Sequence, residues 1–318
     1  MDFNTYCIIW ICIIGLCMGS FYNVVILRSL SGESIVFPPS KCPKCGNKLK
    51  PWHNIPILSY IFLRGKCYFC KEKISIQYPV VEFITMLLFC FSYWKFGLSI
   101  STVFVIIWLS MLLIMTVTDI KERLVDCRIA IAMGISGCIS AFIIGGVAGL
   151  ISSILGIVAG FIIFETIARC GKFIFHTDVM GDADSYVAAA IGGIFGVYNL
   201  PVVLLLGLLS YALIFLPLFI YDKFKLKDYA TVISFFTFVA CAIVQLLIQN
   251  YCSYLLFIVS TIIFVINIYR GLDKKNKREI PYVPAFSTGT LLFIIFFIQD
   301  LSYDNSILSD TITKLLYF

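Results

Sequence analysis

The chain consists mostly of uninterrupted apolar runs close to 20 residues long, the length that a helix needs to cross a bilayer. Thr5 to Leu27 is the first such run. Of the 318 residues, 60% are hydrophobic and only 13% are charged, which excludes an ordinary soluble globular domain. A cleavable signal peptide fits poorly, since Asp2 is acidic and no basic residue precedes the run. We expect this run to stay attached as the first transmembrane helix.

The apolar runs predict an all-α polytopic membrane protein with about ten transmembrane helices. Between the first two runs lies a small cytoplasmic loop domain, whose two CxxC cysteine pairs indicate zinc binding. After the first run, the apolar runs are Tyr78–Phe96, Leu98–Thr118, Ile129–Gly146, Val147–Ala168, Val187–Val197, Leu200–Ile220, Tyr229–Ile248, Tyr251–Tyr269 and Ala285–Ile298. The predicted domains are 1–28 (first helix), 29–77 (zinc loop), 78–299 (membrane domain, with an added helical hairpin at about 229–269) and 300–318 (external tail).

The basic residues set the expected orientation. Arg28 to Gln77, the longest polar stretch, carries nine Lys and Arg residues against Glu33 and Glu72. Excess positive charge in short loops marks the cytoplasmic side, so the zinc loop is predicted inside and the N-terminus outside. The remaining basic clusters fall in alternate turns, as this topology requires. The net charge of +6 therefore indicates membrane topology, and no nucleic-acid partner is expected.

The polar loop contains two closely spaced cysteine pairs. Cys42 and Cys45 form the first C-x₂-C pair, and Cys67 and Cys70 form the second. Four thiolates with this spacing suit a tetrahedral Zn²⁺, and all four positions filled by protein indicate a structural metal. A cytoplasmic loop is a reducing environment, which disfavours disulfides, although a redox pair stays open as an alternative. The metal would supply folding energy to a loop with little apolar core.

Two isolated acids lie at the ends of apolar runs. Asp119 closes one run, and Asp184 stands in the stretch Met180–Asp184 between two others. The topology places both on the cytoplasmic side. Acids at membrane helices are costly and point to a functional site by default. The alternative is that each carboxylate caps a helix start near the headgroups.

Several motifs together resemble the type IV prepilin leader peptidases, membrane enzymes that cleave prepilins and then N-methylate them. The N-terminal signature is the part most specific to that family. The matching segments are Gly19–Arg28, Trp52, Asn54–Pro56, Ser59–Tyr60, Leu63–Lys66, Ile74–Ser75, Tyr78–Glu82, Asp119 with Leu124 and Asp126, Gly181–Asp184 and Ile280–Pro284. The likeness covers nearly the whole chain except the hairpin and the tail.

The resemblance implies that Asp119 and Asp184 are the catalytic acids of a GxGD-type aspartyl endopeptidase. Its implied substrates are prepilins or pseudopilins, cleaved after a Gly at the cytoplasmic face of the bacterial inner membrane, where the enzyme also contacts lipid. It further implies N-methylation of the new N-terminus with S-adenosylmethionine, to which the zinc loop and Glu82 would contribute. Gly181, Asp182, Ala183 and Asp126 would support the catalytic motifs.

The chain departs from the family pattern at four positions near the acids. Ala183 replaces the second glycine of GxGD, Asp182 adds an acid, and Val125 and Tyr186 replace a usual proline and lysine. If the missing glycine adopts a positive φ, Ala183 is strained and Ala183→Gly should be tolerated or stabilising. We expect a helix that begins near Asp184, with Asp182 in the turn before it.

Two other functional classes stay open at this stage. A proton-coupled carrier could use paired acids as a proton relay. A zinc-ribbon membrane assembly factor would need the cysteine quartet and no catalysis. A carrier normally shows internal repeats, and none is recognisable in this sequence.

Overall fold

The computed structural model describes residues 2–37, 39–175, 181–225, 227–248 and 283–298, with isolated positions between 255 and 267. The second run of the predicted hairpin, the turn at 280–282 and the tail at 300–318 lie largely or wholly outside these residues. Residues 1–207 with 281–318 form one compact unit, and residues 208–280 form another.

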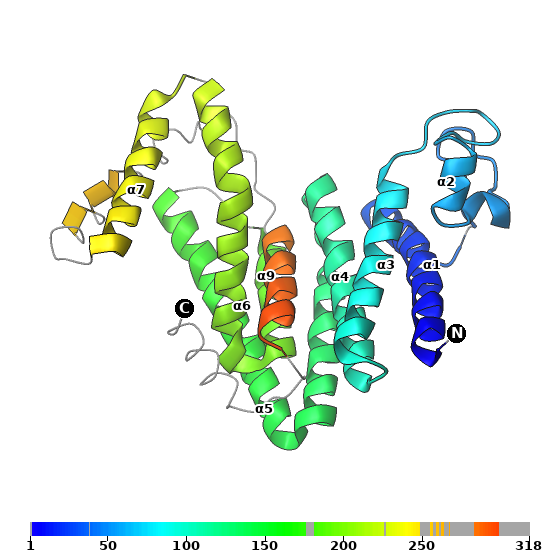
Figure 1. The fold of residues 1–318 in the computed structure, drawn as a ribbon, viewed down its shortest axis with the longest axis horizontal. Coiled ribbons are helices and arrows are strands. Elements are labelled where there is room, and N and C mark those ends of the chain that lie inside the picture. The colour runs from blue at the N-terminus through cyan, green and yellow to red at the C-terminus, as the bar shows by residue number, and fades with distance from the viewer. Residues whose placement is uncertain are drawn as a thin grey trace. The chain divides into compact units, whose positions relative to one another are not determined.

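The described residues are predominantly helical and form no extended sheet, which confirms the all-α class. The elements are α1 (Phe3–Ser31), the 3₁₀ helix η1 (Pro51–Asn54), α2 (Leu58–Phe62), α3 (Gln77–Phe96), α4 (Ile100–Glu122), α5 (Cys127–Phe175), α6 (Asp182–Lys225), α7 (Tyr229–Ile248) and α9 (Val283–Phe296). Figure 1 shows that α1 and α4 end on the side where the loop carrying α2 lies.

Five helices in the described part of the chain are long and apolar enough to cross a membrane. Two of these five, α5 and α6, each consist of two helices that meet at a bend, so one element covers two of the predicted runs. Within α5 the break is a bend at Gly146 (φ 61°), and within α6 it is a bend at Gly196 (φ 73°). Glycine adopts this backbone region without the steric cost of a Cβ. The count of ten stays a prediction.

Glycines let α1 and α3 approach at backbone distance. A Cβ added to Gly15 would lie 2.8 Å from the Met86 Cα, and one added to Gly19 would lie 2.6 Å from the Glu82 Cα. Gly15 and Gly19 form a small-xxx-small pair on one face of α1, the pattern that permits close helix packing in membranes. Larger side chains at either position would push the two helices apart.

Glycines also allow close packing of the two halves of α5, before and after its bend, against the first part of α6. A Cβ on Gly137, before the bend of α5, would lie 2.7 Å from the Gly193 carbonyl carbon. After the bend, Gly156 faces the Gly192 backbone so closely that no side chain fits at either position. These contacts fix the start of α6, and therefore Asp184, relative to α5.

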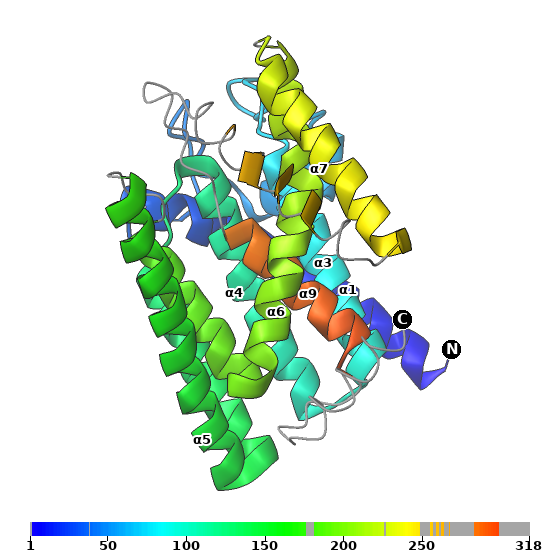
Figure 2. The ribbon, with the colours of Figure 1, turned by 90° about the vertical axis from the view of Figure 1, so that its left-hand side faces the viewer.

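The main core of the first unit joins α4, α6 and α9. Trp108 and Met115 of α4, Ile191 of α6 and Phe293 of α9 are fully buried in one apolar cluster. Both ribbon views place α9, drawn in orange, between α4 and α6 (Figures 1 and 2). This cluster holds the helix ends that carry the two isolated acids.

The second unit has a small core of its own. Ile220 of α6 packs with Val232 of α7. Asp228 caps the start of α7, where it accepts a hydrogen bond from the Thr231 hydroxyl at 2.8 Å and lies 3.8 Å from the Lys223 ammonium. Neither of the two predicted catalytic acids belongs to this unit.

Candidate active site

Asp119 lies in the last turn of α4 and is 5% exposed. Its carbonyl oxygen accepts the N–H of Arg123, which ends the helix in the left-handed conformation. Its side-chain Oδ2 accepts the backbone N–H of Val283 at 3.0 Å, across 164 residues of sequence. Val283 is the first residue of α9, so its N–H has no acceptor within that helix. Asp119 therefore takes the place of an N-cap for α9.

Asp184 lies in the first turn of α6 and is 6% exposed. Its Oδ2 accepts the N–H of Gly181 at 3.2 Å, while its own N–H donates to the Gly181 carbonyl at 3.1 Å. A carboxylate that reaches back to the amide before its helix forms half of a capping box. The partial positive charge of the helix start favours a negative group there. Asp184 therefore caps the start of its helix.

Whether Asp184 has a role beyond capping depends on its position relative to Asp119. The Asp119 and Asp184 carboxylates are close enough for their charges to interact. Two interacting carboxylates in a buried site cannot both ionise easily. Each also receives one backbone N–H. The pair has the composition needed for acid–base chemistry on a bound water, which a capping role alone would not require.

The local structure around Asp184 corrects two expectations and confirms one. The helix begins at Asp182 rather than near Asp184, and Ala183 is helical, outside the residues with positive φ. The strain argued for Ala183 is therefore wrong, and glycine there would weaken the helix. Ala188 and Ile191 are buried below Asp184 on its helix face, as expected. The side chain of Asp182 lies outside the described residues.

Asp126 has a different partner from the acid pair. It precedes α5 and accepts three hydrogen bonds from the Arg128 guanidinium at 2.8–3.2 Å, and a fourth from the Arg128 N–H at 2.9 Å. This guanidinium holds the pKa of the Asp126 carboxyl below its usual value. The geometry makes Asp126 a support for the start of α5.

Two neighbours of the pair were missed by the sequence reasoning. The Val283 amide is a backbone group, so no side-chain pattern in the sequence predicts its hydrogen bond to Asp119. Ser185, buried beside Asp184, donates to Glu165 of α5 at 3.4 Å, and Glu165 also accepts a hydrogen bond from Arg169 at 2.8 Å. The i, i+4 spacing of Glu165 and Arg169 was the available signal for that part of the contact.

The four cysteines converge in the polar loop, as predicted. The sulfur atoms of Cys42, Cys45, Cys67 and Cys70 all lie within 4.8 Å of one another, and those of Cys42 and Cys70 are 3.9 Å apart. Zn–S bonds of about 2.3 Å in a tetrahedron require sulfur separations of roughly 3.8 Å. The donor set and spacing therefore fit one Zn²⁺.

Each cysteine pair sits on the same type of turn. Gly46 donates to the Cys42 carbonyl at 2.9 Å and Lys71 to the Cys67 carbonyl at 3.0 Å, and both donors have positive φ. Backbone N–H groups of Cys70 and Phe69 lower the pKa of the Cys67 thiol to about 7. These amides stabilise the thiolate form that binds metal.

Comparison with known proteins agrees with this arrangement. Residues 13–96 match the model of the bacterial peptidase A24 N-terminal domain, and residues 104–216 match that of the type IV leader peptidase family. A protein of Neisseria gonorrhoeae is 33% identical over 226 residues, covering 62% of this chain and 79% of its own length. One of Bacillus subtilis is 36% identical over 201 residues, covering 63% and 79%. The chain belongs to the type IV leader peptidase family.

A Myxococcus xanthus protein is 33% identical over 184 residues, and the match spans 58% of this chain but only 55% of that relative. All three relatives are named prepilin leader peptidase/N-methyltransferase. No solved structure matches the chain. Membership in the family supports a membrane peptidase and does not favour the carrier or the non-catalytic assembly factor.

Glu82, the residue suggested for methylation, joins the zinc loop to the membrane helices. It is 6% exposed in α3 and its Oε2 accepts the N–H of Ile57 at 2.7 Å. The Ser20 hydroxyl of α1 interacts with the same carboxylate. Glu82 is thus placed beside the loop, in a part of the fold separate from the described partners of Asp119 and Asp184.

Proposed function

We propose that this protein is a membrane aspartyl endopeptidase that cleaves the leader of prepilin or pseudopilin-like proteins after a Gly. In the proposal it then methylates the new N-terminus with S-adenosylmethionine. The observation that carries the peptidase is the buried Asp119–Asp184 pair at the ends of α4 and α6. The names of the relatives support both the substrate class and the second reaction.

In the proposed hydrolysis, the carboxyl groups of Asp119 and Asp184 share one proton. The ionised carboxylate removes a proton from a water molecule, whose oxygen attacks the peptide carbonyl carbon. The protonated carboxyl donates its proton to the carbonyl oxygen, and the tetrahedral species then breaks as the C–N bond cleaves and the amine takes a proton. No covalent intermediate with the enzyme forms. The two acids titrate as a unit, so the base and acid roles belong to the pair.

The backbone donors keep the two carboxylates in place through this cycle. The Val283 N–H holds Asp119 and the Gly181 N–H holds Asp184. Both donors are fixed by helix starts, so they need no side-chain rearrangement during the reaction. The contacts position the pair while protons move between its members.

The proposed setting is the bacterial inner membrane, with the zinc loop and the acids on the cytoplasmic face and the N-terminus outside. Positive charge in the loop supports this orientation. An apolar pilin helix can enter from the bilayer, and its short basic leader stays on the cytoplasmic side. Zinc held by the four cysteines would cross-link the loop, a structural role that leaves the hydrolysis to the acids.

The decisive experiment replaces Asp119 with Asn in the full-length protein. Purified Asp119→Asn and wild type are incubated with a prepilin, and the products are weighed by mass spectrometry with and without S-adenosylmethionine. We expect no cleavage by the variant. Glu122→Gln is the matched control, since Glu122 is an exposed carboxylate less than one turn away. Normal cleavage by a folded, membrane-inserted Asp119→Asn protein would rule out the aspartyl mechanism.

A further inference from the structure

The packing of α1 against α3 brings two cysteine side chains into contact. The Cys12 and Cys90 sulfur atoms lie 3.2 Å apart, although 78 positions separate them in the sequence. A disulfide bond is about 2.05 Å long, so these sulfur atoms are only roughly 1 Å farther apart than a bonded pair. Both side chains are partly buried, and neither belongs to the four cysteines of the loop. The fold therefore holds a second group of closely spaced thiols.

Backbone contact between the two helices fixes the position of this pair. Cys12 shares a helix face with Gly15 and Gly19, which lie three and seven residues further on. Cys90 lies one turn after Met86, and a Cβ added to Gly15 would be 2.8 Å from the Met86 Cα. A disulfide requires Cα atoms about 4.4–6.8 Å apart. Helices that touch one turn away meet this requirement with little movement, so the sulfur atoms can bond without separating α1 from α3.

The pair lies close to the end of α3 that the proposed orientation puts outside the cell. Cys90 is five residues before Lys95, a distance of about 7.5 Å along a helix. Beyond the pair, the Tyr93 hydroxyl donates to the Asn4 side-chain oxygen at 3.2 Å and joins the two helices near their ends. Disulfides form and persist on the outer, oxidising side of a cell, whereas the predicted side of the zinc loop is reducing. The two groups of thiols therefore belong to different redox compartments.

We propose that Cys12 and Cys90 form a disulfide bond that links α1 to α3, with a membrane quinone as the oxidant. The two thiols together lose two electrons and two protons as the S–S bond forms. The quinone takes up both electrons and both protons and becomes a hydroquinone. A quinone dissolves in the bilayer, so it reaches a pair that lies between apolar helices. Formation of this bond in the cell requires the proposed orientation but neither of the proposed reactions.

The bond closes a segment of the chain that contains the whole polar loop. α1 packs mainly on α3, and Ile13 and Ile14 beside Cys12 are exposed. A covalent link between the two helices therefore attaches α1, and with it the start of the loop, firmly to the rest of the unit. A cross-link across a long segment also restricts the unfolded chain. The oxidised protein should therefore unfold at a higher temperature than the reduced protein.

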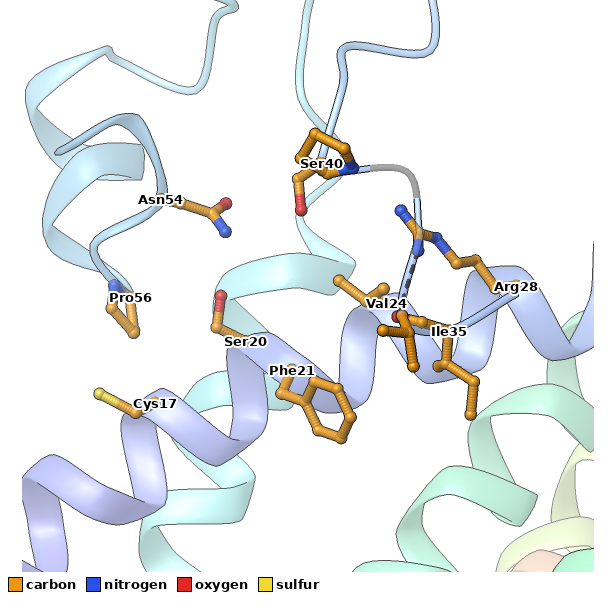
Figure 3. Close-up of a pocket in the computed structure, with 11 residues that line it drawn as sticks. Cys17, Ser20, Phe21, Val24, Arg28, Ile35, Ser40, Asn54 and Pro56 are labelled. Carbon is orange, nitrogen blue, oxygen red and sulfur yellow. Dashed lines mark hydrogen bonds between the residues drawn. The ribbon is translucent and has the colours of Figure 1, made fainter. Parts of the chain in front are cut away.

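The test uses the full-length protein in lipid vesicles. The protein is reduced, freed of reductant under argon and treated with a short-chain ubiquinone analogue. Remaining thiols are alkylated, and the peptides are mapped by mass spectrometry without reduction. Cys12→Ser and Cys90→Ser each remove one partner. Cys17→Ser is the matched control, since Cys17 is an exposed thiol of the same helix. Figure 3 shows Cys17 on the side of α1 that faces Pro56 of the loop.

We expect the quinone to remove two alkylatable thiols per chain in wild type and in Cys17→Ser, with a linked Cys12–Cys90 peptide and one hydroquinone per link. In Cys12→Ser and Cys90→Ser the remaining partner should be alkylated in full, and the quinone should no longer raise the unfolding temperature. Zinc content reports on folding, and if one of these two variants loses its zinc, the other decides the matter. Wild-type Cys12 and Cys90 that both stay open to alkylation overturn the proposal. A bond from either one to Cys17 or to a loop cysteine also overturns it.

Discussion

The hydrogen bond from the Val283 N–H to Asp119 can be removed with one substitution, Val283→Pro. Proline has no N–H, and its fixed φ suits the first position of a helix, so the change deletes the donor while α9 can still form. The next residue is already Pro284, and the first turn of α9 accommodates that ring. The perturbation is therefore confined to one 3.0 Å contact and to the packing of one buried side chain.

The expected size of the effect follows from the type of bond that is lost. A hydrogen bond to a charged group contributes about 1.5–3 kcal/mol. At about 1.4 kcal/mol per factor of ten, loss of a contact that holds Asp119 in its reactive position lowers kcat about 10- to 150-fold. The substrate segments bound away from Asp119 are unaffected, so we expect little change in KM.

The assay is initial cleavage rates of a prepilin by purified protein, quantified by mass spectrometry over a range of substrate concentrations. Val283→Ala is the matched control, because it keeps the N–H and removes only buried methyl groups. It should lose thermal stability yet keep kcat within about threefold of wild type. A folded Val283→Pro protein with wild-type kcat refutes this reasoning. Equal losses of kcat in both variants would assign the effect to packing instead of the hydrogen bond.

Three further outcomes are expected. Asp184→Asn should abolish cleavage while Asp182→Asn only weakens it; an inactive Asp182→Asn beside an active Asp184→Asn would shift the catalytic position by two residues. Metal analysis in reducing buffer should find one zinc per wild-type chain. Cys67→Ser should lose this zinc, and its loop should become more sensitive to protease because the metal supplies folding energy. A zinc-free wild type would count against the site. Deletion of residues 229–269 should preserve cleavage, since the pair lies in the other unit, and a properly inserted but inactive deletion would show that these helices build the substrate groove.

The sequence was most informative where side-chain chemistry and spacing are fixed together. The two C-x₂-C pairs predicted a metal site because four thiolates at that spacing suit a tetrahedral zinc ion. Asp119 and Asp184 stood out because acids are costly in apolar runs. Both inferences came from residue type. The structure brings the four cysteine sulfur atoms together, and the catalytic role of the two acids stays a prediction.

The sequence could not show contacts made by the backbone. Every residue except proline carries an N–H, so nothing distinguishes the amide of Val283 until the fold brings it to Asp119. Apolar runs also do not say how two successive helices are joined, and the structure joins them through bends at Gly146 and Gly196 without an intervening loop. The prediction of strain at Ala183 was wrong because the φ angle of a residue depends on where its helix begins, and α6 begins before Ala183.

The long separation between Asp119 and its donor has a consequence for how the protein is synthesised. The ribosome adds Val283 only 164 residues after Asp119. At typical bacterial and eukaryotic synthesis rates of about 5–20 residues per second, that interval is roughly 10–30 s. During this time α4 and α6 can already lie in the membrane while one carboxylate still lacks its amide. A newly made chain therefore completes the hydrogen bond that holds Asp119 only after α9, the last described helix, has been synthesised.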